Sequence, residues 1–91
     1  MPVYLVVSDN TFSLDKIKRS YPADYIQIFS NSFLINYEFE AWRLRDEIGN
    51  LVYEENPNFE IVITVVEKTD LALLKNVDIY VNYIFNRSKS K

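Results

Sequence analysis

The chain has no histidine and no cysteine, so any chemistry that it performs depends on carboxylates, hydroxyls, lysines and arginines. Histidine is the usual general base near neutral pH, and cysteine supplies thiolate nucleophiles and zinc ligands. A bound metal would therefore be a hard ion such as magnesium, held by oxygen ligands. The carboxylate best placed for such a site is Asp9, which follows the apolar run VYLVV after one serine.

Asp9 has two interpretations. A carboxylate between the end of a strand and the start of a helix commonly forms a turn or caps the helix. Alternatively, Asp9 is a catalytic residue that holds a magnesium ion, with Ser8 and Asn10 orienting a water molecule or a phosphate. One carboxylate alone binds magnesium weakly, so this second role is strongest if dimerisation brings two copies of Asp9 together.

Basic residues follow Asp9 at a short distance, at Lys16, Lys18 and Arg19. They are candidate contacts for the phosphates of a nucleic acid. The alternative is an ordinary solvated helix face, because exposed helix surfaces are normally charged. The net charge of −3 and the pI near 4.8 give the protein no overall positive field.

Aromatic residues make up 15% of the chain, and a domain of this size cannot bury all of them. Aromatic side chains are enriched at the centres of protein interfaces. We therefore expect some of them to contact a second copy or a protein partner, and the alternative is a place in the core. The candidate interface residues are Phe39, Trp42, Tyr80 and Tyr83.

The first half of the sequence predicts a strand, a short helix and a hairpin. Apolar residues at three- and four-residue spacing follow Ser13 and stop before Pro22, which is typical of an amphipathic helix. Two apolar runs then meet at Ser30-Asn31, and Asn tolerates the positive φ that tight hairpin turns need. The predicted ranges are a strand at 3–7, a helix at 13–21, and hairpin strands at 25–29 and 32–35.

The second half predicts a longer helix over 37–51, capped by Asn36 and ended by a left-handed residue at Gly49 or Asn50. The run FEIVITVV, residues 59–66, has the strongest strand pattern in the chain. Residues 77–85 alternate as a strand, although a helical stripe also fits them. Their β-branched and aromatic residues favour the strand.

This order of elements predicts an α+β fold, a ferredoxin-like βαββαβ sandwich with a fifth strand at the C-terminal end. We expect one domain over residues 1–86, followed by a solvated basic tail at 87–91. Residues 59–66 would form a sheet edge that is apolar on both faces, and such an edge invites another strand from this chain or from a second copy. No run is long enough to span a membrane, so we expect a cytoplasmic protein.

The order and lengths of these elements resemble the Cas2 group of CRISPR-associated proteins and their relatives, which include VapD-type ribonucleases and small SinR-family proteins. The resemblance covers residues 3 to about 85, and Asp9 matches the acidic residue that closes the first strand in that group. It implies a homodimer in which two such aspartates hold magnesium for phosphodiester hydrolysis. The chain departs from the family at Ser8, where Tyr or Phe is usual, and in its weakly basic first helix.

Two functions follow as expectations. The resemblance implies a homodimer that acts on or with nucleic acid, and its activity as a magnesium-dependent nuclease is left open. The acidic charge and the aromatic residues favour an alternative: a non-catalytic interaction or inhibitor protein, encoded for example by a phage or plasmid, which binds a bacterial protein.

Overall fold

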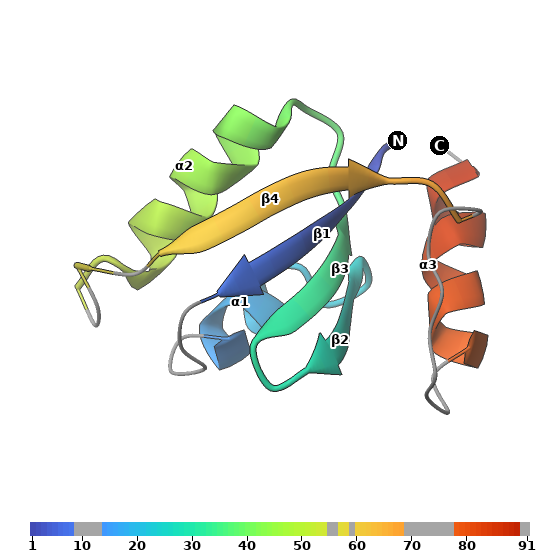
Figure 1. Ribbon diagram of the computed structural model, residues 1–91, viewed down its shortest axis with the longest axis horizontal. Coiled ribbons are helices and arrows are strands. Elements are labelled where there is room, and N and C mark those ends of the chain that lie inside the picture. Colours follow the sequence, from blue (N-terminus) through green and yellow to red (C-terminus); the bar gives the residue numbers. More distant parts are fainter. Residues whose placement is uncertain (9–13, 55–56, 59, 69–77, 90–91) are drawn as a thin grey trace.

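The structure, a computed structural model, describes residues 1–8, 14–54, 57–58, 60–68 and 78–89 (Figure 1). Its elements in chain order are β1 (Val3–Ser8), α1 (Leu14–Ser20), β2 (Tyr25–Phe29), β3 (Ser32–Asn36), α2 (Ala41–Val52), β4 (Ile61–Val66) and α3 (Asp78–Lys89).

The four strands form one sheet in the order β2-β3-β1-β4, and each strand is antiparallel to its neighbours. Two βαβ connections with this interleaved order make a ferredoxin-like sandwich. The predicted α+β, ferredoxin-like class is therefore confirmed. β1 lies at the centre of the sheet, where Val6 faces Phe33 of β3 on one side and Ile63 of β4 on the other.

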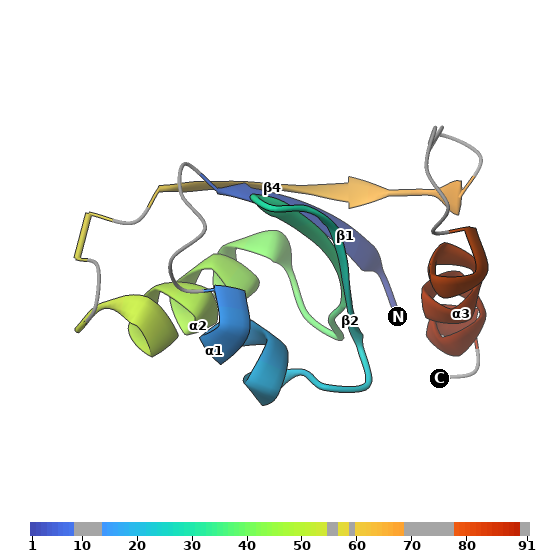
Figure 2. The ribbon, with the colours of Figure 1, turned by 90° about the horizontal axis from the view of Figure 1, so that it is seen from below.

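A first hydrophobic core lies between the sheet and the helices α1 and α2. Side chains alternate across a strand, so Tyr4 and Val6 of β1 point to the same face of the sheet. Figure 2 shows the sheet nearly edge-on, with α1 and α2 together on one side of it. The buried members of this core are Tyr4, Val6, Ile17, Tyr25, Phe33, Ile35, Tyr37, Leu44, Ile48 and Val52.

A second core covers part of the opposite face, and the helix α3 forms it. Val3 and Leu34 point to this face and contact the buried α3 residues Val81, Ile84 and Phe85. The predicted fifth strand at 77–85 is therefore wrong, because residues 78–85 are helical. The spacing of the three buried residues matches one side of a helix, and burying that side outweighs the β propensity of the sequence.

The exposure of Tyr83 supports the same conclusion. In a strand Tyr83 would share a face with Val81 and Phe85, but its side chain is 49% exposed whereas theirs are buried. Residue 77 lies outside the described part of the chain.

The predicted hairpin is confirmed, with β2 and β3 joined at Ser30-Asn31. The expected positive φ is wrong, because no described residue has one. A register irregularity between Gln27 and Phe29 of β2 adjoins the turn. Asn31 also holds the end of β1, since its carbonyl oxygen accepts a hydrogen bond from the Ser8 amide at 2.8 Å.

The start of α2 differs from the prediction. The helix begins at Ala41 and its N-cap is Glu40, which makes no side-chain capping hydrogen bond. Asn36 ends β3 instead and is buried, where its Nδ2 donates to the carbonyl oxygen of Ile84 at 3.0 Å. The helix also continues past Gly49 to Val52, so the predicted left-handed stop is wrong as well.

The last helix includes residues that the sequence placed in a tail. Arg87 of α3 pairs with Asp24, with 2.6 Å between Nε and Oδ1. The amino group of Met1 donates to the carbonyl oxygen of Ser88 at 3.3 Å, so the two ends of the described chain meet. Residues 87–89 therefore belong to the folded domain. Within the described ranges, no helix is long and apolar enough to cross a membrane.

Candidate interaction site

The outer side of α2 carries two exposed aromatic side chains. Leu44, Ile48 and Val52 face the first core, as the amphipathic pattern predicts. Trp42 and Tyr53 are 58% and 65% exposed. They are eleven residues apart, about three helical turns, so they extend from the same side of the helix. Large exposed aromatics on one helix side are typical of a binding surface.

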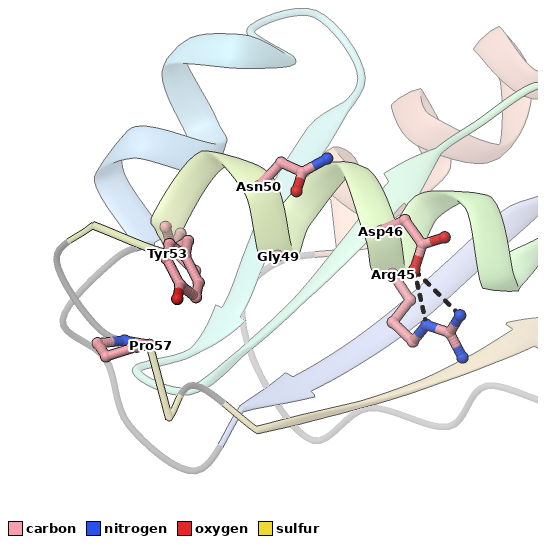
Figure 3. Close-up of a pocket in the computed structure, with 7 residues that line it drawn as sticks. Arg45, Asp46, Gly49, Asn50, Tyr53 and Pro57 are labelled. Carbon is pink, nitrogen blue, oxygen red and sulfur yellow. Dashed lines mark hydrogen bonds and ion pairs between the residues drawn. The ribbon is translucent and has the colours of Figure 1, made fainter.

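A hollow of about 500 Å³ lies on this side of α2. Figure 3 shows Tyr53 and Pro57 at one end and the Arg45–Asp46 pair at the other, with Asn50 above. We call this surface, together with Trp42, the α2 face. Its residues are Trp42, Arg45, Asp46, Gly49, Asn50, Val52, Tyr53 and Pro57.

Gly49 is one of the residues that line the hollow. It is the only glycine of the chain, and it has ordinary helical backbone geometry without a positive φ. A Cβ atom built at this position would meet no atom of the described residues within 4 Å. Neither the backbone nor the packing of the described residues therefore requires glycine here. What glycine provides is access to the helix backbone from outside.

The polar end of the hollow is an ion pair between neighbouring residues. Arg45 approaches Asp46 with both Nε and Nη2 at 3.0 Å from Oδ1. Both side chains are more than half exposed, so the pair adds little to stability. It does present a guanidinium and a carboxylate at fixed places beside the hollow.

The segment that leads into α2 is held by aromatic contacts. The Tyr4 hydroxyl donates to the carbonyl oxygen of Phe39 at 2.7 Å. The Phe39 ring packs edge-on against Tyr37, and the Arg43 guanidinium lies 3.8 Å from the Phe39 ring centroid. A cation over an aromatic face is a favourable electrostatic contact. The segment that precedes α2 is therefore fixed to the central strand β1.

Residues 38–54, which include α2, are acidic. They contain five carboxylates against two arginines, Arg43 and Arg45. One carboxylate, Glu47, faces inward and accepts a hydrogen bond from the Tyr21 hydroxyl at 2.8 Å. Burial and then this hydrogen bond raise the pKa of Tyr21. Burial and then Glu47 also raise the pKa of Tyr37, to about 12.

Two residues predicted as sites have side chains that the structure does not describe. Asp9 lies outside the described residues, so its predicted roles in catalysis and metal binding stay predictions. Tyr80 belongs to α3, but its side chain is also outside the description. Among the side chains that the structure describes, no group of three or more carboxylates is arranged to hold a metal ion.

The predicted basic residues lie on α1. Lys18 and Arg19 are exposed and line a second hollow with Asp15 and Pro22, whereas Lys16 is half-buried. Asp15 places a carboxylate beside the two cations. Lys18 and Arg19 therefore line one hollow, and Lys16 is not among the residues that line it.

The predicted aromatic interface is divided between the two faces of the sheet. Phe39 and Trp42 lie on the side of α2, and Tyr83 lies on α3, which covers the opposite face. One flat partner surface cannot contact all three. Sequence reasoning missed Tyr53 and the hollow at Gly49, and the signal available for them was a single glycine inside an amphipathic helix.

β4 forms the edge of the sheet next to α2. All six of its residues are β-branched, and Val62 and Val65 are 67% and 58% exposed. In the described part of the chain no strand pairs with its outer side. The expected apolar edge is present, although the strand predicted beside it is a helix.

No protein-family model and no curated protein matches the chain.

Proposed function

We propose that this protein is a homodimeric interaction protein without a catalytic role, which binds another protein through the α2 face. The observation that carries the proposal is the exposure of Trp42 and Tyr53 on one side of α2, with the open backbone of Gly49 between them. Trp and Tyr contribute more binding energy at interfaces than most other residues.

The hollow fits one protruding side chain of a partner. Its volume of about 500 Å³ exceeds that of a single side chain, and its walls offer both a ring and polar groups. Tyr53 and Pro57 give apolar contact, whereas Asp46 and Asn50 give hydrogen-bond acceptors. The excess of carboxylates in residues 38–54 favours a partner surface with lysine or arginine.

The experiment immobilises variants of the chain as baits and compares the proteins that each bait captures from a lysate of the organism that carries the gene. The baits are the native chain, the Trp42→Ala/Tyr53→Ala double variant, Gly49→Leu and the control Phe29→Ala. Phe29 is also exposed, but it lies on β2 at the other edge of the sheet. We expect a protein that the native chain and Phe29→Ala retain equally and that both α2 variants lose about tenfold or more.

The same experiment has a clear negative outcome. Unfolding in urea first establishes that each bait is folded. If every captured protein binds the α2 variants as well as the native chain, the α2 face is not the binding surface. Binding by the α2 face should also persist at moderate salt, because it relies on aromatic contacts as well as charge.

A second candidate function follows from the resemblance to the Cas2 group, and the position of Lys18 and Arg19 beside one hollow favours it. In this candidate the homodimer acts on nucleic acid, Lys18 and Arg19 contact phosphates, and Asp9 binds magnesium. The test is cleavage of labelled RNA and DNA with magnesium or with a chelator. We expect magnesium-dependent cleavage that Asp9→Asn abolishes.

Asp9→Asn is informative because it keeps the size and hydrogen-bonding capacity of the side chain while removing its charge. Equal cleavage by both proteins, or cleavage by neither, contradicts the second candidate. Phosphate binding by Lys18 and Arg19 would also weaken steeply between low and moderate salt.

A further inference from the structure

We propose that two copies of the chain pair through the outer edges of β4, antiparallel and with Thr64 facing Thr64 of the second copy. The inference rests on the homodimer proposed above and specifies its interface. The two sheets of four strands would then form one continuous sheet of eight strands.

Within its own residues, β4 carries none of the sequence features that usually protect a sheet edge. Edge strands usually carry a charge, a proline or a bulge that prevents pairing with another chain. The sequence of β4 is IVITVV, which has no charge and no proline. Its pairing with β1 runs from Ile61 to Val66 without a register shift, so it contains no bulge. The strand is regular and ready for pairing on its outer side.

The hydrogen bonds of β1 show which groups of β4 point outward. The N–H and C=O of one residue in an antiparallel strand point to the same neighbour, and successive residues alternate. The Ser8 amide donates to Asn31 beside β3, so the backbone groups of Val7 point to β4. Val7 lies opposite Val62. Val62 therefore points to β1, as do Thr64 and Val66.

The backbone groups of Ile61, Ile63 and Val65 consequently point outward. In an antiparallel pair these residues must face outward-pointing residues of the second copy. Two registers satisfy this condition near the middle of the strand. One places Thr64 on the two-fold axis, and the other places Ile63 there.

The Thr64 register places the two most exposed valines among the described residues beside apolar partners. It places Val62 opposite Val66 of the second copy, and Val65 opposite Ile63 of the second copy. Val62 and Val65 are 67% and 58% exposed in one chain, whereas Ile63 and Val66 are partly exposed. Cross-strand pairs of β-branched residues stabilise a sheet, and this register repeats each pair twice.

Charge also favours the Thr64 register. It places Glu60 opposite Lys68 of the second copy at both ends of the interface. The Ile63 register would place Glu60 opposite Val66 of the second copy, where the carboxylate gains no charged partner. Opposite charges across two strands contribute a modest stabilisation, and here they would distinguish two registers.

The pairing also limits what Asp9 can do in this dimer. Ser8 lies opposite Ile61, so the two Ser8 residues are six residues apart along the strands and three strands apart across them. Their separation is therefore about 25 Å. Asp9 follows Ser8 directly, and one residue spans at most about 3.6 Å. Two Asp9 carboxylates cannot share one metal ion in this dimer.

The natural absence of cysteine makes the register directly measurable. In the Thr64 register, two cysteines introduced by Thr64→Cys face each other with Cα atoms about 4.5 Å apart, which permits a disulfide. In that register, Ile63→Cys places its Cα atoms about 8 Å apart, which is too far. The control Tyr53→Cys is exposed but lies away from the edge.

We expect Thr64→Cys to form a covalent dimer in a glutathione buffer, while Ile63→Cys and Tyr53→Cys stay uncrosslinked. Crosslinking of Ile63→Cys alone overturns the register. If neither edge variant crosslinks and sedimentation still shows a dimer, the β4 interface is wrong but the homodimer stands. If the native chain sediments as a monomer, the β4 interface and the homodimer both fail, whereas binding through the α2 face is decided by its own variants.

A charge exchange gives a second test that needs no disulfide. Glu60→Lys and Lys68→Glu each place like charges across the interface, so each should raise the dimer dissociation constant about 2- to 10-fold. The double variant restores opposite charges and should return the constant to the native value. A double variant that is weaker than both single variants contradicts the register.

Discussion

Gly49 shows how one residue can be explained by what lies outside the chain. Glycine in a helix interior destabilises a protein relative to alanine, and nothing in the fold requires it at this position. The proposed partner would explain the glycine, because a partner side chain could approach the helix backbone closely only where no side chain stands in its way. Stability and binding then place opposite demands on the same residue.

Gly49→Ala should therefore stabilise the protein by about 0.5–1 kcal/mol, since the added methyl meets no atom and lowers the entropy of the unfolded chain. Unfolding in urea measures the change. A loss of stability would mean that the helix does not continue through residue 49 as described.

The partly buried Tyr21 and the buried Tyr25 and Tyr37 predict how the free energy of unfolding changes in alkali. Burial is the first cause that raises the pKa of Tyr21, and it raises the pKa of both Tyr25 and Tyr37 to about 12. Above pH 10 the unfolded chain loses phenol protons that the folded chain keeps. The contribution of these tyrosines to the free energy of unfolding should therefore be constant below pH 10 and fall between pH 10 and 12.

The measurement is urea unfolding at successive pH values, with Tyr21→Phe as the control. Each tyrosine contributes a slope of up to about 1.4 kcal/mol per pH unit. Tyr21→Phe removes one titrating group, so its stability should fall less steeply over the same range. An equal slope in both proteins contradicts the role of Tyr21.

At the scale of elements, residues 78–85 fit both the alternation of a strand and the apolar stripe of a helix, and two substitutions in α3 distinguish these alternatives. Ile84→Ala should destabilise the protein by about 2–5 kcal/mol, because Ile84 is fully buried against the sheet. Tyr83→Ala should change stability by less than about 1 kcal/mol, because nearly half of that side chain is exposed. The reverse order, measured by urea unfolding, would favour a strand.

The sequence was sufficient for elements that depend on local signals. The hairpin follows from Ser30-Asn31 between two apolar runs, and the buried side of α2 follows from its spacing. α3 was not predictable in this way, because alternation and a helical stripe coexist in residues 78–85. Whether these residues form a helix or a strand depends on how they pack against the second face of the sheet. Local sequence patterns contain no information about that packing.

Asn36 illustrates the same limit for a polar residue. Asparagine before a helix normally caps it, but the buried amide of Asn36 instead contacts the backbone of α3, 48 residues later in the chain. The candidate site shows a similar division. Trp42 and Phe39 were predictable as surface aromatics, whereas the hollow beside Gly49 depends on Pro57, which only the folded chain brings near.

At the scale of the whole molecule, α3 completes a core that the rest of the chain leaves open. A chain of residues 1–77 should expose Val3, Ile28 and Leu34, bind a hydrophobic dye and lose cooperative unfolding. Adding a peptide of residues 78–91 should reverse both effects. Cooperative unfolding of the shortened chain at the native midpoint would show that the second core is dispensable.

The packing of α3 against the second face of the sheet also has a consequence for folding during synthesis. About 70 residues separate the end of β1 from the start of α3, so at about 5–20 residues per second the ribosome needs roughly 4–14 s between them. During that time the central strand keeps an apolar face open to other nascent chains, so termination of synthesis before α3 would yield an aggregation-prone product.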